Sequence, residues 1–141
     1  MGVRNFEDLV VWQVAMDFAE ECCRLSWRFP REERFELASQ LKRSAVSVPS
    51  NIAEGQQRNG PREFIYHLGV ARGSLAEATT QLRIACRLGY LTPDEVMGAL
   101  QTGTRISMMT TALIQRLEGL RTTHDPRPTS RDLADQPSTA E

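Results

Sequence analysis

The sequence predicts an all-α protein, an up-down antiparallel bundle of four helices. Four segments carry apolar residues at alternating three- and four-residue steps, which is the period of a helix buried on one side. Short clusters of glycine and proline separate these segments, and an alternating strand pattern is absent from the sequence. With 141 residues, 40% of them hydrophobic and 25% charged, the chain is expected to form one domain with a substantial core.

The first predicted helix runs from about Phe6 to Trp27 and carries two apolar stripes. One stripe is Leu9, Trp12, Met16, Ala19 and Cys23, and the other is Val11, Val14, Phe18, Cys22 and Leu25. Two stripes are wider than one bundle core requires. Because unburied apolar area of this width is a liability in water, we expect the second stripe, with Phe18 and Leu25, to form a subunit interface.

The second predicted helix follows the break at Phe29-Pro30 and contains an internal proline, Pro49. Its buried seam is Ala38, Leu41, Ala45, Val48 and Ile52. Proline removes one backbone hydrogen bond and clashes with the preceding turn, so the helix either kinks near Ala45 or ends at Val48 and restarts. Ile52 keeps the register of the seam, which favours a kink.

The third and fourth predicted helices are bounded by clear start and stop signals. Pro61 is expected to open the third helix and Gly89 to follow it in a left-handed cap. Thr92 and Glu95 form a predicted capping box at the start of the fourth. The third seam is Phe64, Leu68, Ala71, Leu75, Ala78, Leu82 and Ala85; the fourth is Val96, Ala99, Gly103, Ile106, Thr110, Leu113, Leu117 and Leu120.

The predicted bundle spans residues 1–121, and residues 122–141 are expected to be a disordered tail. Three of the seven prolines fall in this tail, and Leu133 is its one large apolar side chain. Such a segment cannot bury enough surface to offset its ordering entropy. The sequence lacks both a run of roughly 20 apolar residues and a signal-peptide pattern, so we expect a cytoplasmic protein without a membrane partner.

Three stretches carry a resemblance to a known family. They are FEDLVVWQVAMDFA, FPREERFELASQLKRSAVSVPSNIAEGQQR and EFIYHLGVARGSLAEATTQLRIACRLGYL, in this order. Over Asn5 to Leu120 the chain resembles the 23S ribosomal RNA intervening-sequence, or four-helix-bundle, protein family. The most specific elements are SVPSNIAEG, from Ser47 to Gly55, and ARGSLAE, from Ala71 to Glu77.

The resemblance implies an assembly and partners. The family includes the accessory variability determinants of diversity-generating retroelements, which are similar bundles that form pentameric barrels. These proteins use basic surface to bind RNA or DNA and a reverse transcriptase. By this resemblance we expect a ring-like homopentamer whose partners are the RNA or DNA backbone and, in a retroelement, a reverse transcriptase.

Basic residues outnumber acidic ones in the middle of the chain. The net charge is −1, but Gln40 to Tyr90 holds seven basic residues against three acidic ones. On a helix Arg72 and Arg83 lie on nearly the same face, Arg87 lies one turn beyond, and small residues lie between them. Arginine binds phosphate through a planar donor fork, so we predict nucleic-acid binding by these three. The alternative is a solvated face that forms ion pairs with acids of the first helix. Outlying contacts are assigned to Arg43, Arg58 and Arg62.

The SVPSNIAEG motif is interpreted mainly as a device for bending and packing the second helix. Ser50 and Asn51 can bond backbone groups freed by Pro49, and Glu54 can pair with Arg58 at the i,i+4 spacing. Gly55 completes the motif. Gly69 and Gly73 are four residues apart, and Gly73-Ser74 is predicted to be a tight packing point between helices and not a ligand loop.

Enzymatic functions find little support in the sequence. Glu63 and His67 lie one turn apart, but a di-iron bundle needs such a pair twice with two further carboxylates. Cys22, Cys23 and Cys86 lack zinc-ligand spacing and are interpreted as reduced packing residues. We therefore expect a non-enzymatic, oligomeric nucleic-acid-binding accessory protein without metal or cofactor. The alternative is a protein-interaction scaffold, encoded in a ribosomal RNA intervening sequence, that does not bind nucleic acid.

Overall fold

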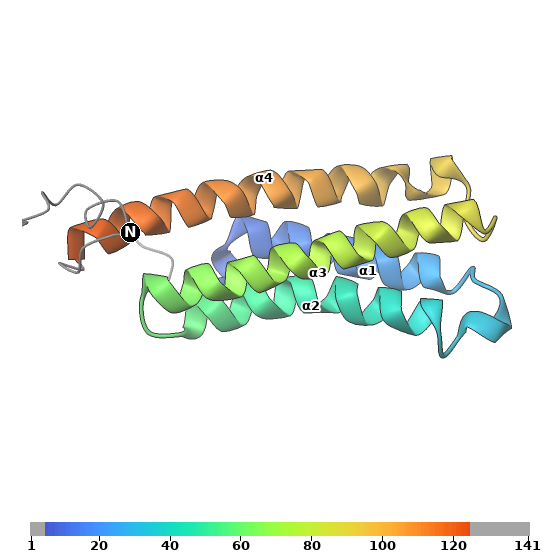
Figure 1. Cartoon of the computed structure of the whole chain (residues 1–141), viewed down its shortest axis with the longest axis horizontal. Helices are drawn as coiled ribbons and strands as arrows, with labels where there is room; N and C mark the ends of the chain where they lie inside the picture. The colour runs from blue at the N-terminus through green and yellow to red at the C-terminus, as the bar shows by residue number, and fades with distance from the viewer. Residues whose placement is uncertain (1–4, 125–141) are drawn as a thin grey trace, which may run out of the picture.

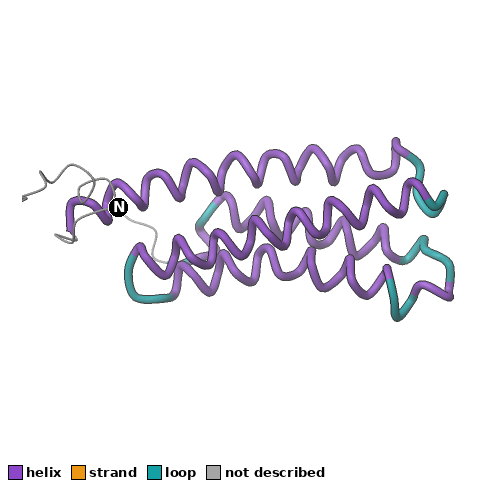
Figure 2. The backbone as a smooth tube through the Cα atoms, in the orientation of Figure 1, coloured by secondary structure: helices purple, strands orange, loops and turns teal. Residues whose placement is uncertain are grey.

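The computed structural model describes residues 5–124, which form a bundle of four long helices (Figure 1). Helix α1 spans Val10–Ser26, α2 Leu37–Gln57, α3 Pro61–Arg87 and α4 Pro93–His124. Two short 3-10 helices, η1 at Phe6–Asp8 and η2 at Arg31–Glu33, precede α1 and α2. Throughout this described part, helices are joined only by turns and loops, with no strand, which confirms the predicted all-α class (Figure 2).

The helices run up and down, so that sequential helices are antiparallel neighbours. The α1–α2 connection and the α3–α4 turn lie at one end of the bundle, and the α2–α3 turn lies at the other (Figure 1). Each of α1 and α3 contacts both α2 and α4. The four elements therefore enclose one core between them.

The predicted seams of α2 and α3 form the centre of this core. Leu41, Ala45, Val48 and Ile52 of α2 are fully buried, and so is Leu82 of α3. The seam of α4 is buried only in its first part. It is covered as far as Thr110, whereas Leu113 and Leu117 are partly buried and Leu120 is 49% exposed. The last turns of α4 extend past the start of α1 and lack its cover (Figure 1).

The structure corrects the prediction for α1. Phe18 is 0% exposed and Leu25 is 8% exposed within the single chain, so neither is available as a subunit interface. The stripe that contains them is the one that α1 turns into the core. The other stripe faces outward beside α2, where Met16 is 44% exposed. The sequence shows two apolar stripes but does not show which of them the neighbouring helices cover.

Helix α2 continues through Pro49 without a break. It is one helix from Leu37 to Gln57, which excludes the alternative of an end at Val48. The Oγ of Ser50 donates to the Val46 carbonyl at 2.8 Å, and the Asn51 amide donates to the Ser47 carbonyl at 2.9 Å. These side chains thus bond the carbonyls of Val46 and Ser47 and not that of Ala45, the one that Pro49 deprives of its donor, which corrects their predicted role.

The predicted caps are confirmed. Helix α3 begins at Pro61, and Gly89 follows it with a φ of 77°, in the left-handed region that favours glycine. Thr92 and Glu95 form the reciprocal capping box, with the Glu95 N–H donating to Thr92 Oγ1 at 3.2 Å and the Thr92 N–H donating to Glu95 Oε1 at 3.3 Å.

Helix α4 ends later than expected. It runs through His124, past the domain boundary predicted at residue 121. The remainder of the predicted tail, residues 125–141, lies outside the described residues. Within residues 5–124, no helix combines the length and the apolarity that crossing a bilayer requires.

Candidate nucleic-acid interface

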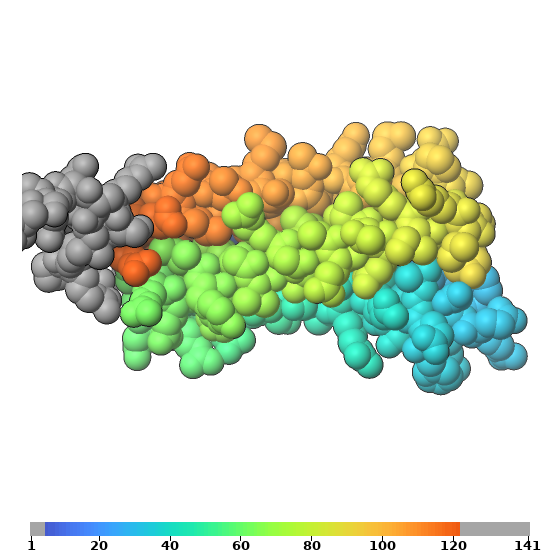
Figure 3. Space-filling view, in the orientation of Figure 1, coloured from blue at the N-terminus to red at the C-terminus, as the bar shows by residue number. Residues whose placement is uncertain are grey.

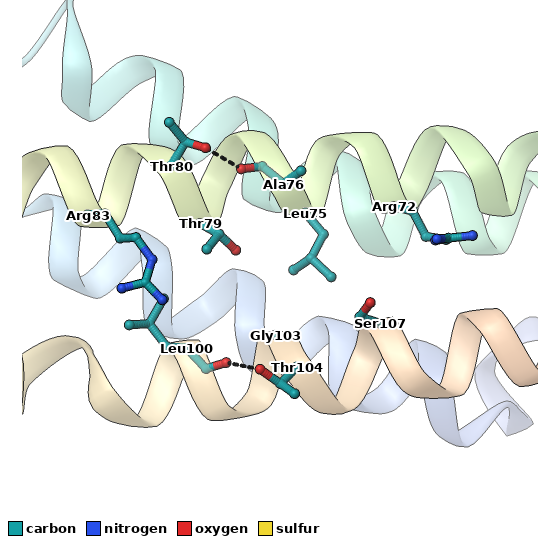
Figure 4. A pocket seen from close by; sticks show the side chains of 10 residues that line it. All are labelled: Arg72, Leu75, Ala76, Thr79, Thr80, Arg83, Leu100, Gly103, Thr104 and Ser107. Atoms are coloured by element: carbon teal, nitrogen blue, oxygen red, sulfur yellow. Dashed lines mark hydrogen bonds between the residues drawn. The ribbon is translucent and has the colours of Figure 1, made fainter.

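Arg72 and Arg83 border a groove between α3 and α4 with a volume of about 400 Å³ (Figure 4). Leu75, Leu100 and Gly103 are among the residues that line it. A Cβ at Gly103 would lie 3.3 Å from Leu75 Cδ1, so a glycine there keeps the two helices close. The two helices therefore approach closely along this groove, and Arg83 and Arg72 lie toward its opposite ends (Figure 4).

Hydroxyl groups line the groove between the two arginines. Thr80 and Thr104 donate to the carbonyls of Ala76 and Leu100, at 2.8 and 3.1 Å (Figure 4). The hydroxyls of Thr79 and Ser107 also line the groove and donate to no other residue of the described chain. They remain able to donate to a bound anion.

Both arginines of the groove lack a carboxylate partner among residues 5–124. The arginines that are paired lie elsewhere: Arg24 contacts Glu20 at 2.7 Å, Arg58 contacts Glu54 at 2.7 Å, and Arg28 contacts Glu95. The ion pairs with acids of the first helix, which were part of the alternative prediction, are therefore absent among the described residues, whereas the solvated face of that alternative is retained. Arg72 and Arg83 present their full charge to the solvent.

The other predicted arginines do not join the groove. Arg87 is exposed one turn beyond Arg83 and does not line it, and Arg43 is exposed on α2. Arg58 and Arg62 lie at the opposite end of the bundle from Arg87, around the α2–α3 turn. A hydrogen bond from Arg58 holds the pKa of the Glu54 carboxyl below its ordinary value. Of the six arginines, the structure thus brings two together.

The SVPSNIAEG motif contributes to a row of polar contacts between α2 and α3. Successive contacts lie three and four residues apart along α2 and seven residues apart along α3. The pairs are Ser44 Oγ with Gln81 Oε1 at 2.6 Å, Ser47 Oγ with Ser74 Oγ at 2.8 Å, and Asn51 Oδ1 with His67 Nδ1 at 3.3 Å. Glu54 Oε2 lies 3.9 Å from the same His67 nitrogen. The motif therefore fixes the register of the two helices, a role that the sequence interpretation did not assign.

Gly55 and Gly73, both of which belong to motifs interpreted as packing devices, have different surroundings in the structure. A Cβ added at Gly55 would lie 2.7 Å from the Cβ of His67 and 3.1 Å from Phe64 Cδ1, so α3 approaches this glycine closely. At Gly73 an added Cβ would meet nothing within 4 Å. The predicted packing point therefore falls on Ser74, which is 8% exposed and contacts Ser47 of α2, and not on Gly73, which lies on the exposed face of α3.

Burial makes the thiol of Cys22 a poor nucleophile. Cys22 is 0% exposed, and burial raises the pKa of its thiol to about 12, so the thiol stays protonated. His67, the one histidine considered for a site, contacts Asn51 and Glu54 as described above. Among residues 5–124 there is no group of three histidine, cysteine or acidic side chains placed to hold a metal ion.

A second basic surface, not singled out from the sequence, lies at the end of the bundle where α1 joins α2. Trp27, Arg31, Arg34 and Lys42 line a pocket of about 430 Å³ there. The available signal was the alternation of aromatic and basic residues in WRFPREERF. This pattern does not by itself predict a pocket, because the pocket forms only when the connection between α1 and α2 folds and brings Lys42 beside Trp27, Arg31 and Arg34.

The family model for 23S rRNA-intervening sequence proteins matches residues 7–112. The chain belongs to the 23S rRNA-intervening sequence protein family. This family assignment covers most of the described bundle and confirms the resemblance drawn from the sequence. No curated protein matches the chain.

A solved structure agrees with this assignment. The 23S rRNA-intervening sequence protein described here is similar to a crystal structure from Bacteroides thetaiotaomicron, of a protein with unknown function from the S23 ribosomal protein family. The two chains are 25% identical, the match covers 74% of this chain and 98% of the other, and the TM-score is 0.69. The comparisons thus establish family and fold, and function has to be argued from the surface.

Proposed function

We propose that this protein is a cytoplasmic, non-enzymatic accessory protein that binds nucleic acid through the α3–α4 groove. The observation that carries the proposal is that Arg72 and Arg83, at either end of a groove lined with hydroxyls, form no ion pair with a carboxylate of residues 5–124. Guanidinium groups without a carboxylate partner bind phosphate without first breaking an ion pair. Threonine and serine hydroxyls are common phosphate ligands.

The chemistry of the groove favours contacts to the sugar–phosphate backbone. Its lining combines guanidinium, hydroxyl and small apolar groups and has no aromatic side chain on which a base could stack. Backbone contacts position a nucleic acid but carry no sequence information. We therefore expect little sequence preference and strong salt dependence, because each neutralised phosphate releases counterions.

The proposal includes a cyclic homo-oligomer, for which the resemblance to accessory variability determinants favours a pentamer. The outward stripe of α1 forms an apolar groove with α2, about 520 Å³ in volume, whose lining includes Trp12, Met16 and Val46. We assign this groove to a second copy of the chain. A ridge of exposed apolar residues on α3 suits it: Tyr66, Val70, Ile84 and Leu88, which are 67%, 37%, 41% and 55% exposed.

The geometry of α3 allows assembly and nucleic-acid binding together. Tyr66 and Ile84 are about five helical turns apart and so lie on one line, whereas Arg72 and Arg83 lie roughly 100° away on the side of α4. A contact that buries the ridge would leave the arginine groove open. A ring would then repeat this groove on every subunit, which increases the number of phosphates bound at once.

Charge reversal in the groove tests the proposed function. The variant Arg72→Glu/Arg83→Glu should weaken RNA and DNA binding by about tenfold or more at low salt, because two phosphate contacts are lost. The plot of log affinity against log salt has a negative slope, which should become less steep by about 1.4 for a single strand that spans one subunit. Binding is measured by fluorescence anisotropy over a series of salt concentrations.

A matched control carries the same change of charge elsewhere. Arg24→Glu/Arg105→Glu alters two exposed arginines that do not line the groove and should bind almost as tightly as wild type. Circular dichroism and light scattering check that helicity and assembly are retained. Absence of any RNA or DNA binding by wild type at low salt, or equal loss in both variants, would show that the groove is not a phosphate site.

A protein-interaction scaffold is the second candidate function, and the apolar α1–α2 groove is the observation that favours it. In a retroelement, the resemblance points to a reverse transcriptase as the protein partner. An adjacent reverse transcriptase gene would identify the molecule to test. The scaffold replaces the first proposal if Met16→Glu abolishes binding of that reverse transcriptase while wild type binds neither RNA nor DNA.

A further inference from the structure

The end of the bundle where α1 meets α2 carries two strongly exposed aromatic side chains. Trp27, directly after α1, is 73% exposed, and Phe35, just before α2, is 82% exposed. This connection projects at the lower right of the space-filling view, in light blue (Figure 3). Exposed single hydrophobic residues are common, but an indole beside a pocket offers a flat binding surface.

The pocket beside Trp27 is basic. Arg31, Arg34 and Lys42 line it, and none of them forms an ion pair with a residue in the described range 5–124. The guanidinium of Arg34 lies 5.4 Å from the centre of the Phe35 ring, which holds it at the surface. Three cations and one indole thus surround a volume of about 430 Å³.

The acidic residues of the same segment do not cancel this charge inside the pocket. Glu33 accepts hydrogen bonds from the Tyr90 hydroxyl at 3.0 Å and from the Leu37 N–H at 3.1 Å, so it is held toward α3 and the start of α2. Glu32 and Glu36 are exposed and are not part of the lining. The lining therefore presents positive charge without a carboxylate.

We propose that this end pocket binds single-stranded nucleic acid, with one base stacked on Trp27 and the adjoining phosphates held by Arg31, Arg34 and Lys42. A base needs a flat apolar partner and its phosphates need cations, and this pocket offers both within one volume of ligand size. A duplex hides the faces of its bases in the stack, so the pocket selects single strands. The inference extends the proposed function, since the α3–α4 groove contacts only the backbone.

An acidic peptide is the competing ligand, because it would also satisfy the three cations. Carboxylates need no flat partner, however, and would leave the indole of Trp27 exposed. A nucleotide uses the aromatic and the basic groups together. The observations therefore favour the nucleotide, and the test includes the peptide.

Trp27 itself supplies the readout of the experiment. The chain has two tryptophans, so Trp12→Phe leaves Trp27 as the one fluorophore of this kind. The assembled variant is titrated with oligo-dT, with a duplex of equal length and with inorganic polyphosphate, which carries charge without bases. Oligo-dT should quench the emission at saturation, polyphosphate should leave it nearly unchanged, and the duplex should quench weakly.

Affinities are compared by anisotropy of labelled oligo-dT in the otherwise wild-type chain. Trp27→Ala should weaken binding by about tenfold, the usual effect of losing one stacked base, whereas Trp27→Tyr should retain most of the affinity. Met108→Ala is the control: Met108 is a large apolar side chain, 70% exposed, that lines neither the end pocket nor either groove, and its loss should not change binding.

Several outcomes would overturn the end pocket. These are equal quenching by polyphosphate and oligo-dT, equal affinities of the Trp27→Ala and Met108→Ala variants, or quenching by an oligo-glutamate peptide without any by oligo-dT. The groove is tested separately by adding Arg72→Glu/Arg83→Glu to the single-tryptophan chain. If this change leaves affinity intact and oligo-dT still quenches Trp27, the groove fails and the end pocket stands.

Discussion

Gly55 of α2 faces His67 of α3 so closely that a Cβ on the glycine would lie 2.7 Å from the Cβ of the histidine. The histidine atom is next to the backbone and cannot swing away, so a side chain at residue 55 would push the helices apart. We predict that Gly55→Ala lowers the free energy of unfolding by about 1–3 kcal/mol, the usual cost of overpacking. Urea denaturation followed by circular dichroism measures it.

Gly73→Ala is the control for this substitution and should have the opposite effect. Gly73 also lies inside a helix, but nothing is within 4 Å of its missing Cβ. Alanine is a better helix former than glycine, so the variant should be more stable by about 0.5–1 kcal/mol. Similar changes of stability in both variants would contradict the close approach at Gly55.

The hydroxyls of Ser47 and Ser74, 2.8 Å apart between α2 and α3, predict a coupled pair. Ser74 is only 8% exposed, so removing one hydroxyl leaves the other poorly solvated. Ser47→Ala and Ser74→Ala should each cost about 1 kcal/mol, and the double variant should cost clearly less than the sum. Additive losses in a double-mutant cycle would show that the two hydroxyls do not interact.

Glu95 predicts a dependence of stability on pH. The hydrogen bond from Arg28 is the main cause that lowers the pKa of Glu95 in the folded protein below the ordinary 4.5. A lowered pKa stabilises the fold above the unfolded value, and this contribution is lost as the pH falls through the folded value. Glu95→Gln keeps the cap on Thr92 but removes the charge. The variant should therefore unfold more easily than wild type at neutral pH, with a gap that closes in acid. Thermal melts across this range measure the gap, and a constant gap would contradict the assignment.

The proposed assembly predicts that Met16→Glu yields a monomer. Met16 lines the α1–α2 groove and is 44% exposed, so a carboxylate there would be buried by a second copy and oppose association. Met108→Glu, at a 70% exposed residue outside that groove, should assemble as wild type does. Light scattering reports the mass, and a wild-type particle of 15.9 kDa at micromolar concentration would rule out the oligomer.

The sequence predicted those features that depend on one helix at a time. The seams of α2 and α3, the capping box at Thr92 and the shared face of Arg72 and Arg83 follow from helical period alone. Features that depend on what lies opposite were predicted less well. Two apolar stripes on α1 look alike until α2 and α4 cover one of them, which is why Phe18 was assigned to the wrong surface.

The same distinction, between residues of one helix and contacts between elements, explains which parts of the candidate sites could be predicted from the sequence. Arg72 and Arg83 belong to one helix and were found, but their groove also needs Gly103 and Ser107 of α4. Arg58 has the same charge, yet its partner Glu54 neutralises it. The pocket beside Trp27 was missed because its cations come from a connection and from the helix after it, and helical periodicity does not describe a connection.

Neighbouring helices bury the first part of α4 more completely than its last part, so the hydrogen bonds of the helix should open more easily near its end. Near the α3–α4 turn this helix packs against both α1 and α3, and its amides should exchange with deuterium only when much of the bundle opens. Beyond Thr110 the seam is only partly buried, at Leu113 and Leu117, and Leu120 is 49% exposed, so amides near the end of the helix should exchange through fraying. The bundle is thus stiff at the end that presents Trp27 and Arg83 and compliant at the end where α4 runs on alone.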